Sequence, residues 1–363
     1  MAGHVAFLLP NMGAGGAERL TLDLMAGFIA RGVQVDLVLL ARTGAFLSLV
    51  PEGVRIIDLA APRLRKAFLP LRRYLVREKP DALVAAMWPL TAVAVAAAAG
   101  LAQRPRVILS DHCPLKQQYA QRLGQLRLSM LATYRFADAV VGVSDGLSDE
   151  LAELAGISRA RVTTIANPVP RPRQSGVDPQ DLWQGRKGKR LLSVGTLKAE
   201  KNHALLIDAF ALATRDQDAV LAIVGEGEAR GRLEAQVTCL GLADRVLLPG
   251  YAATPGDWYA GADLFVLSSD YEGFGNVMVE AMHFGLPVVA TDCPYGPADV
   301  LGADVLRAGR WGALVPRGDA VALARAMCKT LATPHDPAAQ IERAMDYSQE
   351  RAVAGYWQLM ALR

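Results

Sequence analysis

Short apolar runs alternate with segments of helical period along the whole chain. Runs such as Val-Leu-Ala-Ile-Val at 220–224 lack polar residues, which is typical of strands buried on both faces of a sheet. Between these runs apolar residues recur every three or four positions, as in amphipathic helices. This alternation predicts an α/β fold in which helices cover a parallel sheet. The expected strands span residues 4–9, 33–40, 54–58, 82–85, 107–109, 139–143 and 162–165 in the first half, and 190–194, 220–224, 246–248, 264–267 and 287–290 in the second.

Length and one proline-rich stretch predict two domains. The chain has 363 residues, and a single hydrophobic core rarely organises more than about 250–300 residues. The stretch 167–176 contains three prolines, which block both helix and central strand, so we place the connection there. We expect a Rossmann-like first domain over residues 1–168, a linker over 169–188, a Rossmann-like second domain over 189–345, and a terminal helix over 346–363 that packs back toward the first domain.

The charge balance is that of a folded protein, but it is uneven along the chain. A net charge of +3 with 21% charged residues excludes a disordered or strongly nucleic-acid-binding chain. The first 170 residues nevertheless hold 19 basic and 13 acidic side chains. Arginines lie on one face of segment 63–79, where we expect Pro70 to interrupt the helix, and segment 116–130 is amphipathic. We predict peripheral contact of this basic domain with anionic lipid, and no nucleic-acid partner.

The spacing of cysteines and histidines argues against disulfides and metals. The four cysteines form no Cys-x-x-Cys pair and the five histidines form no His-x-x-x-His pair. We therefore expect no metal, no bound cofactor and a cytoplasmic location, peripheral at the inner face of the membrane. The N-terminus lacks a basic opening and a cleavage site, so no signal peptide is expected. The apolar run 90–102 is shorter than the about 20 residues that a bilayer needs and predicts a buried helix that Gly100 ends.

Two glycine-rich turns each follow an expected strand and precede an expected helix. They lie at 11–18 and 272–276. Glycine lets the backbone approach a ligand closely, and the free amides at a helix start attract phosphate. The first turn fails as a dinucleotide-binding fingerprint, because Glu18 replaces its last small residue and no acid ends the second strand, where Leu39 and Leu40 stand.

The second turn lies between two acids, Glu272 and Glu280. Carboxylates accept hydrogen bonds from vicinal sugar hydroxyls, so acids on both sides of a phosphate-binding turn suit a sugar nucleotide. Either acid alone would also fit a solvated residue that complements the helix dipole, but that interpretation leaves the intervening glycines unexplained. A third loop, 195–201, carries Lys198 and Lys201, which are able to compensate the charge on a departing diphosphate.

These motifs resemble family 4 of the retaining glycosyltransferases, which have the GT-B fold. The resemblance covers nearly the whole chain. It implies two Rossmann-like parallel-sheet domains that face each other across a cleft, the first binding the acceptor and the second a nucleotide sugar. The stretch 291–297 is similar to enzymes that build bacterial lipid-linked or surface polysaccharides, including lipopolysaccharide. The motifs that carry the resemblance are 15–18, 141–146, 167–169, 194–202, 224–227, 248–251 and 272–280.

The resemblance also implies roles for individual residues. Lys201 would meet the donor diphosphate, Glu280 the ribose, and Glu272 the hydroxyls of the transferred sugar. Tyr251 would lie near the base, and His112 near the reacting centre. The implied catalytic residues are His112, Lys201 and Glu272. The implied donor-binding residues are Gly15, Gly16, Thr196, Lys198, Lys201, Tyr251, Glu272, Gly273, Phe274, Gly275, Asn276 and Glu280.

The implied reaction moves a sugar from a nucleotide sugar to a hydroxyl of a glycan or lipid-linked acceptor, with retention of configuration. The resemblance favours UDP as the nucleotide. Two positions depart from the family pattern, since Thr196 stands where many members have Arg and Asp299 where they have Glu. Either Lys198 compensates for the missing cation, or Lys201 and helix amides hold the diphosphate alone. The alternatives are a sugar-nucleotide epimerase on the same scaffold, a non-enzymatic nucleotide- or glycan-binding module and, despite the failed fingerprint, a nicotinamide oxidoreductase.

Overall fold

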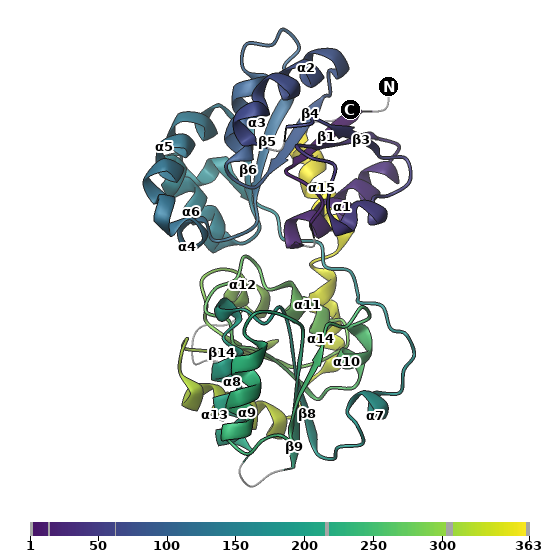
Figure 1. The fold of residues 1–363 in the computed structure, drawn as a ribbon, viewed down its shortest axis with the longest axis vertical. Coiled ribbons are helices and arrows are strands. Elements are labelled where there is room, and N and C mark those ends of the chain that lie inside the picture. The colour runs from purple at the N-terminus through teal and green to yellow at the C-terminus, as the bar shows by residue number, and fades with distance from the viewer. Residues whose placement is uncertain (1–2, 14, 62, 215–217, 303–307, 361–363) are drawn as a thin grey trace. The chain divides into compact units, whose positions relative to one another are not determined.

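The computed structural model describes residues 3–13, 15–61, 63–214, 218–302 and 308–360. The chain divides into two compact units, which are described separately (Figure 1). Unit 1 combines Met1–Pro168 with Ser348–Arg363, and unit 2 is Val169–Tyr347. The predicted α/β fold is confirmed, because each unit contains a largely parallel sheet whose strands alternate with helices along the chain.

Unit 1 contains a seven-stranded parallel sheet in the order β3-β2-β1-β4-β5-β6-β7. In its register, Val5 lies beside Val35 of β2 and Ala82 of β4. All seven expected strands are present, with ends that differ from the prediction by at most two residues. The chain order reverses between β1 and β4, and open α/β sheets bind ligands at such switch points. The strands are β1 (His4–Leu9), β2 (Gln34–Leu39), β3 (Arg55–Asp58), β4 (Ala82–Ala86), β5 (Arg106–Asp111), β6 (Ala139–Gly142) and β7 (Val162–Thr164).

The helices of unit 1 correct one prediction. Pro70 does not interrupt its helix, because it is the third residue of α2, where a backbone N–H has no intrahelical acceptor to lose. The buried helix predicted in the run 90–102 is confirmed as α3, and Gly100 follows it with a φ of 68°. The helices are α1 (Gly16–Ile29), α2 (Phe68–Glu78), α3 (Leu90–Ala98), α4 (Leu115–Gln118), α5 (Leu123–Thr133), α6 (Asp145–Ala155) and α15 (Gln349–Met360).

Helix α15 is part of unit 1 although it follows unit 2 in the chain. Its Val353 and Tyr356 are fully buried in the hydrophobic core beneath the sheet. Trp357 stacks on Phe28 of α1, with 6.0 Å between the ring centroids. Figure 1 shows α15 beside α1, in yellow and purple respectively. Two distant segments of the chain therefore build one core.

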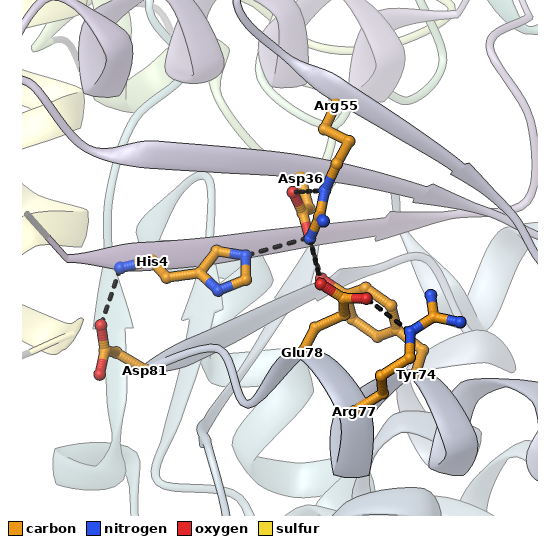
Figure 2. A network of polar contacts seen from close by, with 7 residues as sticks. All are labelled: His4, Asp36, Arg55, Tyr74, Arg77, Glu78 and Asp81. Atoms are coloured by element: carbon orange, nitrogen blue, oxygen red, sulfur yellow. Dashed lines mark hydrogen bonds and ion pairs between the residues drawn. The ribbon is translucent and has the colours of Figure 1, made fainter.

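A buried carboxylate ties several elements of unit 1 together (Figure 2). Asp36 of β2 is fully buried and accepts hydrogen bonds from Arg55 Nε at 2.9 Å and Nη2 at 2.6 Å. The Tyr74 hydroxyl donates to Asp36 at 2.6 Å, and His4 Nε2 lies 3.0 Å from the same oxygen. Burial alone would raise the pKa of Asp36, but hydrogen bonds from these three partners outweigh it and hold the pKa well below its usual value. An ionised carboxylate thereby links β1, β2, β3 and α2.

Unit 2 contains a second sheet, in the order β10-β9-β8-β11-β12-β14-β13. Its five expected strands are confirmed, with ends shifted by at most two residues. The last two strands were not predicted, and β13 is the one antiparallel strand of the described sheet. The strands are β8 (Lys189–Val194), β9 (Ala219–Val224), β10 (Val246–Gly250), β11 (Leu264–Leu267), β12 (Val288–Thr291), β13 (Ala308–Gly309) and β14 (Gly312–Val315).

The helices of unit 2 pack around this sheet and end in the segment that leads back to unit 1. They are α7 (Pro179–Leu182), α8 (His203–Ala213), α9 (Arg230–Cys239), α10 (Gly256–Ala260), α11 (Asn276–Met282), α12 (Pro297–Leu301), α13 (Ala320–Ala332) and α14 (Pro337–Met345). Across the residues that the structure describes, in either unit, no helix has both the length and the apolar character needed to cross a membrane.

The segment 169–188, expected as a linker, belongs to unit 2. The Asp257 carboxylate accepts hydrogen bonds from the backbone amides of Ser175 at 2.9 Å and Gly176 at 3.2 Å. Trp183 is fully buried and packs edge-on against Trp258, with ring centroids 5.5 Å apart. The segment is therefore anchored to unit 2 by a capped turn and a large aromatic side chain.

Candidate active site

The predicted catalytic residues of unit 2 lie in the loops that follow β8 and β11, which are neighbours in the sheet. Parallel neighbours end at the same sheet edge, so their loops meet there. Lys201 ends the 3₁₀ turn η6 (Ala199–Lys201), and its Nζ lies 2.6 Å from Glu272 Oε1. The Ser269 hydroxyl donates to the same oxygen at 2.6 Å. The lysine and acid singled out by the sequence therefore form one ion pair.

This ion pair is partly shielded from water. The Lys201 and Glu272 side chains are 21% and 10% exposed. Lys201 lies along the backbone of Gly195, where an added Cβ would come within 3.7 Å of the lysine Cε. Partial burial strengthens a pair relative to one on the open surface, because water screens it less. The remaining exposure leaves both groups within reach of a ligand.

Three hydrogen bonds brace the two loops against each other. The Ser268 hydroxyl donates to the carbonyl oxygen of Lys201 at 2.9 Å. Asn202 Nδ2 donates to Asp270 Oδ1 at 3.1 Å, and the Asp270 amide donates to the Glu200 carbonyl at 2.8 Å. The position of the ion pair is therefore fixed by backbone and side-chain contacts on both sides.

The glycine turn 272–276 leads from β11 into α11. Gly275 precedes the helix with a φ of 87°, a left-handed conformation that favours glycine, and Asn276 is the first helical residue. Gly296 approaches this turn so closely that a Cβ there would collide with the Phe274 carbonyl. The backbone of the turn is thus held in place by a second glycine that sequence reasoning did not single out.

Glu280 lies one turn into α11 and has its own partner. The Tyr259 hydroxyl donates to Glu280 Oε2 at 2.8 Å. Tyr259 is fully buried, and burial together with the Glu280 charge raises the pKa of its hydroxyl well above the usual value. The hydroxyl therefore stays protonated and remains a donor to the carboxylate. This contact fixes the direction in which Glu280 points.

Three further predicted donor residues are exposed. Thr196 and Lys198 lie in the loop after β8. Tyr251 follows β10, and 79% of its surface is exposed. Lys198 lines a cavity whose other walls are the start of α8 and the side of α9, and neither Lys201 nor Glu272 lines that cavity. Of the two lysines that the sequence grouped together, Lys198 therefore lines this cavity and Lys201 does not.

Unit 1 carries the other predicted residues. Gly15 immediately precedes α1 in an extended conformation, Gly16 is its first residue, and both are exposed at the carboxyl end of β1. His112 follows β5, and its Nε2 lies 3.1 Å from the Ser110 hydroxyl, which lies 2.6 Å from the Tyr356 hydroxyl. Burial lowers the pKa of His112 to about 4. A hydrogen bond with a nearby asparagine acts in the opposite direction, but its effect on the pKa is smaller. The ring is therefore neutral at neutral pH.

Sequence reasoning missed the side chains that position these residues. Ser269 could have been predicted, because it follows a strand at the carboxyl ends of the sheet, where α/β folds bind ligands. Tyr259 lies 21 positions from Glu280, and Tyr356 lies 246 positions from Ser110, so no local spacing indicates either contact. Among the residues that the structure describes, no group of three or more His, Cys, Asp and Glu side chains gathers as a metal site requires.

Family models account for both units. One described as Glycosyltransferase Family 4 matches residues 14–172, and one described as Glycosyl transferases group 1 matches residues 188–333. With two Rossmann-like units, these matches define a glycosyltransferase of the GT-B fold. Glycosyltransferase models thus cover both units, and the chain is a GT-B glycosyltransferase of the bacterial polysaccharide type. Since both models describe glycosyltransferases, the epimerase alternative is not supported.

Individual relatives agree with this assignment. The lipopolysaccharide core biosynthesis glycosyltransferase LpsE of Rhizobium meliloti is 29% identical over 358 residues, covering 96% of each chain. The Campylobacter jejuni N-acetylgalactosamine-N,N'-diacetylbacillosaminyl-diphospho-undecaprenol 4-alpha-N-acetylgalactosaminyltransferase is 32% identical over 190 residues, which cover 52% of this chain and only 50% of that relative.

Solved structures show the same fold. The lipopolysaccharide outer core galactosyltransferase WaaB, in its apo form, has a TM-score of 0.78 at 19% identity and covers 99% of both chains. The Anabaena protein HepE, solved in complex with UDP, has a TM-score of 0.78 at 25% identity and covers 99% of this chain and 98% of its own.

Proposed function

We propose that this enzyme transfers a sugar from a UDP-sugar to a hydroxyl of a glycan or lipid-linked acceptor, with retention of configuration, during synthesis of a bacterial lipopolysaccharide or surface polysaccharide. The observation that carries the proposal is the Lys201–Glu272 ion pair, which lies at the carboxyl ends of β8 and β11 and directly before the turn into α11. A lysine neutralises a diphosphate leaving group, and a carboxylate binds sugar hydroxyls.

Donor binding exchanges the partner of Lys201. In the ligand-free protein the lysine bonds Glu272 at 2.6 Å, and a diphosphate brings a competing anion. Lys201 then pairs with the phosphate. Glu272 loses the lysine, keeps its hydrogen bond from Ser269 and becomes available to bind the sugar. Glu280, oriented by Tyr259, takes the ribose. UDP is the favoured nucleotide because the HepE relative, 25% identical, was solved with UDP.

We assign binding of the acceptor to unit 1. Attack by the acceptor then completes the reaction. In the proposed step the acceptor hydroxyl attacks the anomeric carbon from the face of the departing diphosphate, and a phosphate oxygen takes the hydroxyl proton. The neutral ring of His112 is suited to a hydrogen bond with the acceptor and does not add a competing charge. A lipid-linked acceptor is favoured because the name of the Campylobacter jejuni relative includes diphospho-undecaprenol, a lipid carrier.

A nucleotide-sugar screen tests the proposal. Purified protein is mixed with UDP-, GDP- and ADP-sugars, and the shift in Tm identifies the donor. The same donor is then incubated with undecaprenol-linked and lipopolysaccharide-core acceptors, and the anomeric configuration of the product is determined by NMR. We expect stabilisation by a UDP-sugar and a product that keeps the donor configuration. An inverted product would refute retention, and donor turnover that needs no acceptor would favour a different reaction.

A further inference from the structure

A cavity of about 250 Å³ lies between the start of α8 and the side of α9 in unit 2. Five of its nine lining residues are polar or charged, and Leu233 and three alanines contribute apolar surface. Lys201, Glu272 and Glu280 do not line it, so it differs from the site proposed for the donor. The polar residues of its wall are Lys198, Asn202, His203, Arg232 and Gln236.

Two cations face this cavity without a counterion. Within the described residues, neither Lys198 nor Arg232 makes an ion pair or a side-chain hydrogen bond. Another arginine of α9 behaves differently, since Arg230 lies between Glu226 at 2.6 Å and Glu234 at 3.0 Å. Two unpaired positive charges at one small cavity repel each other, and an anion between them would relieve that repulsion.

A buried imidazole lines the same cavity. His203 is only 4% exposed, and its Nδ1 is inaccessible and has no hydrogen-bond partner in the part of the chain described. Burial, reinforced by the nearby Lys201 charge, lowers the pKa of His203 to about 4, so the ring is neutral at neutral pH. Because Nδ1 is out of a ligand's reach, the other ring nitrogen, Nε2, is the atom that His203 offers to a ligand in the cavity.

The backbone at this point also favours an anion. Helix α8 has 11 residues, and the Asn202 side chain caps the Leu205 amide. The amides of His203 and Ala204, as the first two of the helix, have no acceptor within it. Gln236 is fixed nearby, because its Nε2 donates to the Ala204 carbonyl at 3.0 Å and to an aspartate of α8 at 2.7 Å. The positive end of the helix dipole therefore points toward the cavity.

We propose that this cavity is a second anion site, which binds the phosphate group of a small phosphorylated molecule independently of the donor diphosphate. Arg232 offers a planar fork of donors, Lys198 a mobile charge and His203 a ring nitrogen. The cavity volume of about 250 Å³ falls below the roughly 300–1,000 Å³ of sites for drug-sized ligands, so it suits a phosphate with a small organic group.

Calorimetric titration with inorganic phosphate tests the site, with phosphate as the probe. The Arg232→Ala variant should bind phosphate roughly ten-fold more weakly, since it loses charge-assisted hydrogen bonds. The matched control is Arg325→Ala, which removes an exposed arginine of α13 that does not line the cavity. The control and Lys201→Ala should both bind phosphate as the unmodified protein does. In parallel, the imidazole NMR signals of His203 should shift during the titration.

Three results would overturn the proposal. They are no saturable phosphate binding by the unmodified protein, unchanged binding by Arg232→Ala, or binding that is lost in Lys201→Ala and kept in Arg232→Ala, which would place the ion in the donor site. Sugar transfer by Arg232→Ala in phosphate-free buffer should match the unmodified enzyme. Failure of this anion site is therefore distinguishable from failure of the proposed transferase function.

Discussion

The Lys201–Glu272 ion pair allows nucleotide binding to be separated from sugar transfer. Replacing Lys201 with alanine removes the proposed contact to the diphosphate, and a charge-assisted hydrogen bond of this kind contributes about 1.5–3 kcal/mol. In the free protein, however, Lys201 already bonds Glu272 at 2.6 Å with the two side chains only 21% and 10% exposed. Because that pair must open first, we expect the lower end of the range, roughly ten-fold weaker UDP binding.

Glu272→Ala should have the opposite pattern. It removes the contact to the sugar but frees Lys201, so UDP binding should be equal to or tighter than that of the unmodified enzyme. Sugar transfer should be abolished. Glu342→Ala is the matched control, because it removes an acid of α14 whose side chain is 80% exposed.

Titration calorimetry with UDP and an assay of sugar transfer, run on the same preparations, check both variants. Urea unfolding confirms that each variant is folded before its activity is interpreted. Full transfer activity in Glu272→Ala would show that the acid has been assigned the wrong role. UDP binding by Lys201→Ala at the unmodified affinity would refute the diphosphate contact.

Four further outcomes follow from the structure. Tyr74→Phe should lower the free energy of unfolding in urea by about 1.5–3 kcal/mol, because the Tyr74 hydroxyl donates to a buried carboxylate. The control is Tyr119→Phe, which loses a hydrogen bond to the neutral Trp88 carbonyl and should lower it by only about 0.5–1.5 kcal/mol. Equal losses in the two variants would contradict this reasoning. The pKa of Asp36 in the folded protein is lowered from the usual 3.8. The ionised carboxylate therefore stabilises the folded state fully above pH 3.8, and this contribution is lost as the pH falls below it. The difference in unfolding free energy between the unmodified protein and Asp36→Asn should shrink over the same acidic range. Sugar transfer should persist in excess chelator, and a strict need for magnesium or manganese would reveal an overlooked ion site. Vesicles of anionic lipid should bind the protein at low but not high salt, aided by exposed apolar residues such as Leu128, which is 70% exposed; absence of low-salt binding would reject the membrane contact.

The strands of both sheets were predictable because buried parallel strands are continuous apolar runs. The pair β13 (Ala308–Gly309) and β14 (Gly312–Val315) escaped prediction. These strands have two and four residues, and glycines at their facing ends weaken the signal that a longer apolar run would give. Pro70 was misjudged for a different reason. Its effect depends on its position relative to the helix start, which periodicity locates only to within a few residues.

The candidate site was predictable as residues but not as contacts. Glycines, acids and a lysine at recognisable spacing pointed to Glu272 and Lys201. Their ion pair spans 71 positions and forms only because β8 and β11 become neighbours in the sheet. Lys198 lies three positions from Lys201, yet it lines a cavity that Lys201 does not line.

The path of the chain has a consequence for how the protein is made. Unit 1 is interrupted after Pro168 and resumes at Ser348, and the ends of the inserted unit meet where the Val169 amide donates to the Tyr347 carbonyl at 2.8 Å. A ribosome therefore completes unit 2 before it synthesises α15, so the part of the unit 1 core around Phe28 stays uncovered until α15 has been made. Domains usually fold in the order of synthesis. Here the unit that is begun first is the last to close, and its open core needs protection during that interval.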